Sequence, residues 1–529
     1  MSDIRNVLFI SADQWRAECL SILGHPNIKT PYLDALSRDG VLFKNHFTVT
    51  SPCGPSRASL LTGLYLMNHR SGRNGTPLDR RFTNIALETR RAGYDPHLIG
   101  YTDTSLDPRA LQNDDPALQT YESVMPGFNV HLQMTDRMAP WISFLQSKGY
   151  PIEGRKDAYK PRQEFLKPTN RGFSFVPPLF KAEDSETAFT GKAVRDFIIS
   201  QKRESWFLHA IFLRPHPPLI APEPYHALYD PSKMPKPRRK QSWEEEAHQH
   251  PHLRAMIAAM RRTRFEHHPV NPLNMDDLEL TQLRATYYGL ITQVDEEIGK
   301  IIACLKETGQ YDHTLIIFTV DHGEMLGDHH CWGKETYFEQ SFRIPLIIRD
   351  PRKDANASRG RQYAEFTESV DIMPTILNWL DLPIPDQCDG LSLMPFLCAN
   401  SIQTWRQYAF SELDFRASPN APDCMAESEL GLTPDQCTLA IIRNQQYKYI
   451  HFTSLASLLF DLQDDPCEFI DRSCDPAYQK IKMEMMHQML NWRLLHADRS
   501  LSNIQLAPAG PFVKHPRWTM IHEYSNNPL

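Results

Sequence analysis

The chain has 529 residues, of which 41% are hydrophobic and 23% charged, ordinary proportions for a folded globular protein. A net charge of -7 gives no general reason to expect nucleic-acid binding, and no apolar run approaches the ~18 residues of a membrane span. The N-terminus has no charged-then-apolar signal segment, and the 10 cysteines form no C-x-x-C pair, which suits reduced thiols. We therefore expect a cytoplasmic protein that binds neither nucleic acid nor membranes.

The first part of the chain alternates short apolar runs with helical patterns. The apolar runs, typical of strands buried on both faces, cover 6–11, 41–49, 97–100, 206–213 and 314–320. The helical stretches include 28–40, 277–308 and 369–380. Thr30 is expected to cap the first helix, with Pro31 in its first turn. This alternation predicts an α/β catalytic domain over residues 1–385, built on a mixed, mostly parallel sheet between two layers of helices.

Two segments of this domain, 110–200 and 222–275, have weaker periodicity and more Pro, Lys and Arg. We interpret them as insertions that border the site or make oligomer contacts. In the second segment, the basic run 235–240 and the acidic run 244–246 are expected to be solvated.

After about residue 385 the pattern changes to short strand-like runs at 408–415, 438–443, 447–452 and 458–462, followed by a helix over about 476–496. These runs predict a smaller α+β subdomain over 386–529, with an antiparallel sheet and one covering helix. The tail 506–529 contains four prolines and three aromatic residues. We expect it to pack on the body or on a neighbouring subunit.

The stretch 51–63, SPCGPSRASLLTG, places Cys53 just before a predicted helix start. Pro55 suits the first turn, where its missing N–H costs nothing. Free backbone donors and the positive end of the helix dipole then face Cys53, and Arg57 adds a cation. Such a position attracts an anion. The alternative is a structural cysteine at a helix cap.

Asp13, Asp321 and His322 stand at the ends of two predicted strands. In open α/β sheets, ligands bind outside the carboxyl ends of the strands, so these side chains are expected to converge. Two carboxylates and a neutral imidazole suit one divalent cation, Ca or Mn, with open positions for substrate oxygens. His329 and His330 are expected to stabilise a turn rather than to bind a second metal.

The sequence strongly resembles the formylglycine-dependent sulfatases of the alkaline phosphatase superfamily. Residues 53–57 match the family's C-x-P-S-R motif, residues 321–324 match its D-H-G-E stretch, and residues 460–468 resemble its YDL-x-x-DP-x-E ending. The resemblance implies an alkaline phosphatase-like fold and a small anionic ester as substrate. It also implies that other cellular machinery oxidises Cys53 to formylglycine, whose hydrated form attacks phosphorus or sulfur.

The residues that follow the run 97–100 indicate which branch of the family the chain resembles. Many sulfatases carry Lys and His where this chain has Tyr101 and Asp103. The tyrosine resembles the phosphonate monoester hydrolases, although a hydroxyl residue is expected there at position 103. Asp103 could repel a dianionic substrate or orient Tyr101, and both readings stay open.

Our first hypothesis is therefore a hydrolase of phosphonate monoesters and phosphate diesters with promiscuous sulfate ester hydrolysis. The alternatives are a true arylsulfatase, a two-metal phosphatase or mutase with a Ser or Thr nucleophile, and a non-catalytic binding protein.

The resemblance also implies roles for single residues. Metal ligands are Asp13, residue 53, Asp321 and His322. Catalytic residues are Cys53, Arg57, His216 and Lys334, and substrate contacts are Asn74, Tyr101, Asp103, His216 and Lys334. Arg57 would stabilise the ionised diol, while His216 and Lys334 would neutralise charge or protonate the leaving oxygen. We expect a homo-oligomer, either a dimer or a tetramer.

Overall fold

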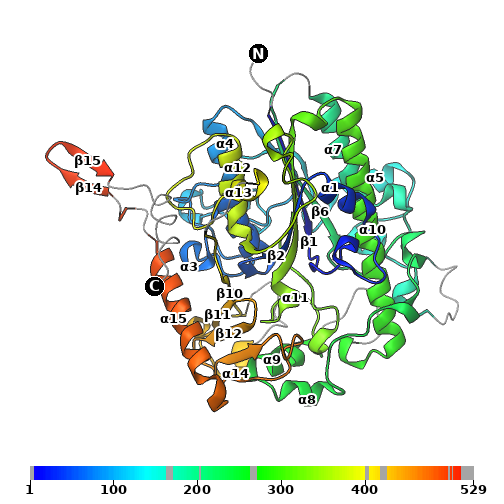
Figure 1. The fold of residues 1–529 in the computed structure, drawn as a ribbon. Helices are drawn as coiled ribbons and strands as arrows, with labels where there is room; N and C mark the ends of the chain where they lie inside the picture. Colours follow the sequence, from blue (N-terminus) through cyan, green and yellow to red (C-terminus); the bar gives the residue numbers. More distant parts are fainter. Residues whose placement is uncertain are drawn as a thin grey trace.

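The computed structural model describes residues 5–162, 171–201, 204–261, 271–399, 404–417, 426–498, 501–502 and 504–513. At its centre is an eight-stranded sheet in the order β5-β4-β6-β1-β7-β8-β2-β9 (Figure 1). Its strands are β1 (Asn6–Asp13), β2 (Val41–Phe47), β4 (Pro96–Gly100), β5 (Asn129–Gln133), β6 (Phe207–Pro215), β7 (Thr314–Val320), β8 (Arg343–Arg349) and β9 (Gln362–Glu368). Of these strands, only β8 runs antiparallel to its neighbours, so the prediction of a mixed, mostly parallel sheet is confirmed.

Helices cover both faces of this sheet, because successive side chains of a strand point in opposite directions. One layer contains α1 (Pro31–Arg38), α7 (Glu186–Ser200) and α10 (Asp277–Glu307); the other contains α2 (Cys53–Thr62), α4 (Ile85–Arg91) and α12 (Ile372–Trp379). In β1, Leu8 and Ile10 pack with the first layer, whereas Val7 and Phe9 pack with the second. The central strand is therefore buried on both sides, as its continuous apolar sequence predicts.

A second, five-stranded sheet has the order β13-β12-β11-β10-β3. Its strands are β3 (Thr50–Ser51), β10 (Ala409–Asp414), β11 (Thr438–Arg443), β12 (Tyr447–Phe452) and β13 (Leu458–Asp461). The strands β10 to β13 are antiparallel and are covered by α15 (Gln479–His496), as predicted. The sequence did not predict β3, which pairs with β10 in parallel and leads directly to Cys53. The C-terminal sheet therefore holds the residues that precede α2.

The remaining helices lie mostly in connections between strands. They are α3 (Leu66–His69), α5 (Ala139–Ser147), α6 (Arg155–Ala158), α8 (Trp243–Ala247), α9 (Pro251–Met260), α11 (Glu339–Phe342), α13 (Met394–Leu397) and α14 (Ala426–Leu430). The expectation that residues 244–246 are solvated is wrong for Glu246, which is buried and accepts a hydrogen bond from His329 Nδ1 at 2.6 Å. His330 Nε2 lies 3.1 Å from the carbonyl oxygen of Lys240. Both histidines thus hold their turn against this segment.

The strands β14 (Ile504–Ala507) and β15 (Gly510–Val513) form a hairpin that stands away from the body of the molecule (Figure 1). Of the two alternatives expected for the tail, packing on the body is wrong for residues 506–513, whereas packing on a neighbouring subunit stays a prediction. Residues 514–529 lie outside the described part of the chain. None of the described helices combines the length and the apolar character that a bilayer span requires.

Candidate active site

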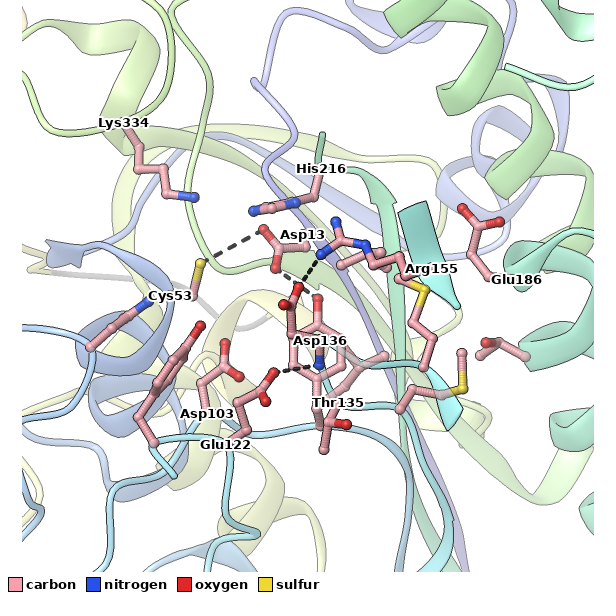
Figure 2. A pocket seen from close by; sticks show the side chains of 18 residues that line it. Asp13, Cys53, Asp103, Glu122, Thr135, Asp136, Arg155, Glu186, His216 and Lys334 are labelled. Carbon is pink, nitrogen blue, oxygen red and sulfur yellow. Dashed lines mark hydrogen bonds and ion pairs between the residues drawn. The ribbon is translucent and has the colours of Figure 1, made fainter. Parts of the chain in front are cut away.

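Polar side chains from four neighbouring strands meet at one edge of the central sheet. Asp13 ends β1, Tyr101 follows β4, His216 follows β6, and Asp321 and His322 follow β7. Because β4, β6, β1 and β7 are adjacent and parallel, their carboxyl ends open on the same side. One cavity there is lined by seven of the residues singled out from the sequence: Asp13, Cys53, Asn74, Tyr101, Asp103, His216 and Lys334 (Figure 2).

Cys53 is the first residue of α2, after Pro52 in an extended conformation. The next N–H, that of Gly54, donates to Asn74 Oδ1 at 2.9 Å. A Cβ on Gly54 would lie 3.0 Å from this oxygen and 3.0 Å from the carbonyl oxygen of Asp103, so glycine suits the position best. The Ser56 hydroxyl donates to the carbonyl oxygen of Asp321 at 2.6 Å. These contacts fix the helix start against the ends of the strands.

Asp13, Cys53, Asp321 and His322 form a buried group whose ligand atoms all lie within 4.8 Å of one another. His322 Nδ1 lies 3.1 Å from the carbonyl oxygen of Gly323, which can only accept, so this nitrogen carries the proton. The other nitrogen, Nε2, faces the Cys53 Sγ at 3.2 Å. Burial and the charge of Lys334 lower the pKa of His322, which keeps its imidazole neutral. The group therefore fits one divalent cation.

Arg57 connects the carboxylates of this group. Its Nη2 donates to Asp13 Oδ2 at 2.6 Å and to Asp321 Oδ2 at 2.9 Å, and its Nη1 donates to Asp103 Oδ2 at 2.7 Å. The guanidinium carbon lies 4.1 Å from the ring centre of Tyr101, whose hydroxyl donates to Asp13 Oδ2 at 2.7 Å. A single buried cation therefore orients three carboxylates at once.

The carboxylates of this group have opposite pKa shifts. Burial and the charge of Asp13 raise the pKa of Asp321. Burial acts on Asp13 in the same direction, but the charges of His216 and Arg57 outweigh it and lower the pKa of Asp13. Two carboxylates this close resist ionising together unless a cation lies between them. A divalent cation bound between them would offset this repulsion and would displace the proton from Asp321.

The thiol of Cys53 is not prepared to act as a thiolate. Its side chain is buried, and both burial and the charge of Asp13 raise its pKa well above the ordinary value. A neutral thiol is a weak nucleophile.

Lys334 and His216 lie above Cys53 and Asp13 in Figure 2. Burial would lower the pKa of Lys334, but the acidic groups around it, Asp13 and Asp321 among them, outweigh burial and raise the pKa above its ordinary value. His216 Nδ1 lies 2.8 Å from the carbonyl oxygen of Pro217, so Nε2 is its unprotonated nitrogen. Burial lowers the pKa of His216 to about 4, although Asp13 opposes this shift.

Sequence reasoning missed the positioning role of Gln14. Its Oε1 accepts from Lys334 Nζ at 2.7 Å, and its amide nitrogen donates to Glu324. Its backbone φ is 66°, a left-handed conformation that non-glycine residues adopt rarely. In the sequence, Gln14 is marked by its position directly after Asp13. Gln14 thus sets the direction in which Lys334 enters the cavity.

The outer part of the cavity was also missed. It is lined by Tyr121, Glu122, Asp136 and Arg155, which come from the segment interpreted as an insertion (Figure 2). Arg155 Nη1 forms an ion pair with Asp136. Their spacing in the sequence carries no motif, so only the expectation that this segment borders the site pointed to them.

Comparisons with known proteins agree with this geometry. The family model described as Sulfatase matches residues 5–382. The chain is 42% identical over 513 residues to the multifunctional alkaline phosphatase superfamily protein PehA of Trinickia caryophylli, covering 96% of this chain and 98% of that protein. It is 28% identical to an arylsulfatase of Clostridium perfringens, covering 78% and 82% of the two chains. The solved phosphonate monoester hydrolase of Agrobacterium radiobacter is 42% identical, with a TM-score of 0.91 over 97% of this chain and 100% of that one.

Proposed function

The chain belongs to the sulfatase family of alkaline phosphatase-like hydrolases, and within this family we propose that it hydrolyses phosphonate monoesters and phosphate diesters, with sulfate esters as slower substrates. The relatives at 42% identity support this substrate class, since one of them is a phosphonate monoester hydrolase. The arylsulfatase relative, at 28% identity, supports sulfate ester hydrolysis as the alternative main activity.

The observation that carries the proposal is the pairing of Tyr101 and Asp103 with Arg57. A sulfate ester presents three acceptor oxygens, whereas a phosphonate monoester or phosphate diester presents two and an organic substituent. The Asp103 carboxylate can only accept hydrogen bonds, and the Tyr101 hydroxyl is directed at Asp13. This side of the cavity therefore offers no donor from these two residues to a third oxygen. A third substrate oxygen at this position would be repelled by the carboxylate oxygens of Asp103. A carbon or ester substituent of the substrate avoids this repulsion.

The chain's own residues would hold the two groups that the family uses. Asp13, Asp321, His322 and residue 53 would bind one divalent cation, Ca or Mn, which supplies Lewis-acid activation. Formylglycine at position 53, as its hydrate, supplies one hydroxyl for attack and a second whose ionisation releases the product.

The remaining residues act on the substrate. Lys334 neutralises charge on the transferred group, and Arg57 keeps Asp13 and Asp321 oriented. Asn74 accepts the Gly54 N–H through its Oδ1, which places its side chain in the cavity wall beside Cys53 and within reach of a bound ester. Burial lowers the pKa of His216, whereas an anionic ester bound beside it would raise this pKa, which suits His216 for protonating the leaving oxygen.

Substrates that share one leaving group test the proposal. We expect a higher kcat/KM for p-nitrophenyl phenylphosphonate and bis(p-nitrophenyl) phosphate than for p-nitrophenyl sulfate. Asp103→Asn removes the repulsion and adds a donor, so the sulfate-to-phosphonate ratio should rise by about tenfold. Asp114→Asn, at an exposed position, is the matched control. A wild-type preference for sulfate would instead identify the enzyme as an arylsulfatase.

Mass spectrometry of the peptide that contains Cys53 tests the nucleophile. We expect the mass of formylglycine in active enzyme. Unmodified cysteine in fully active enzyme would contradict the proposed chemistry.

A further inference from the structure

The outer part of the cavity contains one carboxylate without a cation of its own, that of Glu122. The other carboxylates away from the metal group each have an arginine: the pairs are Asp103 with Arg57, Asp136 with Arg155, and Glu186 with Arg214. Glu122 Oε1 accepts a hydrogen bond from the backbone N–H of Asp136. Within the described part of the chain, no Lys, Arg or His forms an ion pair with Glu122. The charges of Arg155 and Arg137 act on it from beyond ion-pair distance, and Arg155 is engaged by Asp136.

Glu122 lines the cavity beside an aromatic residue, Tyr121. Both side chains are half-buried. Burial raises the pKa of Glu122, and burial together with the charges of Asp103 and Glu122 raises the pKa of Tyr121. A carboxylate next to an aromatic ring, partly removed from water, is a favourable environment for an ammonium group.

The two ends of the cavity therefore differ in charge. Lys334 and the cation site lie at the Cys53 end, where they attract an anion. Figure 2 shows Glu122 beside Asp103, on the side opposite Lys334 and His216. A ligand with an anionic centre at one end and a cationic group at the other matches both ends, whereas a second anionic group would face Glu122.

We propose that Glu122, with Tyr121, is a specificity-determining subsite that selects esters whose organic substituent carries a positively charged ammonium group. The inference rests on the proposed hydrolysis of phosphonate monoesters and phosphate diesters. It deepens that function, because it names the part of the substrate that the outer cavity recognises. The apolar side chains of Met134 and Met138 also line this cavity and suit the methylene groups that join the two charges.

Three p-nitrophenyl alkylphosphonates with the same leaving group test the subsite. Their phosphorus substituents are 2-(trimethylammonio)ethyl, the neutral isostere 3,3-dimethylbutyl, and 2-carboxyethyl. We expect wild-type kcat/KM to be about tenfold higher for the cationic ester than for the neutral one, and lowest for the carboxylate. In Glu122→Gln, which keeps an acceptor for the Asp136 N–H, the cationic-to-neutral ratio should fall close to one.

The comparison between variants removes the intrinsic reactivity of each ester, because that reactivity is the same for every variant. Glu153→Gln, at an exposed carboxylate outside the cavity, is the matched control and should keep the wild-type ratio. A ratio near one in the wild type, or a ratio that Glu122→Gln leaves unchanged, would overturn the subsite and leave the proposed function intact. Absence of hydrolysis of all three esters would overturn both.

Discussion

At the scale of single residues, Cys53 is enclosed by a ring of contacts that also holds two other side chains of the cavity wall, Asn74 and Lys334. The Ser51 hydroxyl donates to the carbonyl oxygen of Lys334 at 2.9 Å, and Asn74 Oδ1 accepts from the N–H that follows Cys53. The ring is closed by Arg73, which precedes Asn74, and Glu335, which follows Lys334. Arg73 Nη1 and Glu335 Oε1 form an ion pair at 2.5 Å. The ion pair between Arg73 and Glu335 therefore fixes the distance between Asn74 and Lys334 across Cys53.

Glu335→Gln tests this positioning role. The amide keeps an acceptor but loses the charge, so the two segments can separate slightly, and displacements of this size cost about 10- to 100-fold in catalysis. We expect kcat/KM to fall within this range, mainly through KM, with metal content and Tm close to the wild type. Asp196→Asn, which breaks an exposed ion pair on α7, is the control. Equal losses in both variants, or a loss that follows Tm alone, would contradict the role.

At the scale of elements, helix α1 is capped by a residue far away in the sequence. The N–H groups of Tyr32 and Leu33 donate to the Asp295 carboxylate of α10 at 3.1 and 2.7 Å. The predicted cap, Thr30, stands at the N-cap position but makes no capping hydrogen bond, because its hydroxyl contacts Ser21 and Asp34 instead. Two of the free donors of the helix are therefore satisfied through tertiary structure.

Asp295 predicts a pH dependence of stability. Burial raises its pKa from 3.8 to about 7. A carboxyl group with a raised pKa binds its proton more tightly in the folded state, so the folded state loses stability as pH rises through this window. Relative to Asp295→Asn, the wild-type free energy of unfolding should fall by up to about 4 kcal/mol between pH 4 and 7 and stay level above it. Urea unfolding of the wild type and of Asp295→Asn at several pH values in this range measures the difference. If the free energies of unfolding of the two proteins change in parallel with pH, the prediction is wrong.

These elements also show how far the sequence predicts the structure. Apolar runs such as 314–320 locate buried strands, because continuous burial leaves a direct mark on composition. The pairing of β3 with β10 and the cap from Asp295 join residues more than 250 positions apart, and nothing in the local pattern indicates such contacts. The same holds for the site: strand ends pointed to Asp13 and Asp321, whereas Gln14 and Glu122 act through neighbours that only the fold brings near.

At the scale of the whole molecule, the C-terminal hairpin and helix α15 carry apolar side chains that the described chain leaves exposed. On α15, Met485, Met489 and Trp492 are buried in a cluster with residues of the C-terminal sheet. Another face of the same helix exposes Met483 (70%) and Leu494 (60%), with Met486 and Leu490 between them; in the hairpin, Leu506 is 84% exposed. An isolated two-stranded hairpin is marginally stable in water, and such apolar surface marks interaction sites.

A second copy of the chain would cover both surfaces, because each copy supplies one hairpin and one α15 face in a reciprocal, twofold arrangement. We therefore expect a homo-oligomer, and light scattering after size exclusion should give a dimer or tetramer mass. Truncation after Asp498, which removes the hairpin, and Leu490→Glu, which charges the α15 face, should both yield monomers. Ile199→Glu, at a 63% exposed site on α7, should leave the mass unchanged. A monomeric wild type at every concentration, or truncated protein that keeps the oligomer mass, would show that the hairpin does not mediate association.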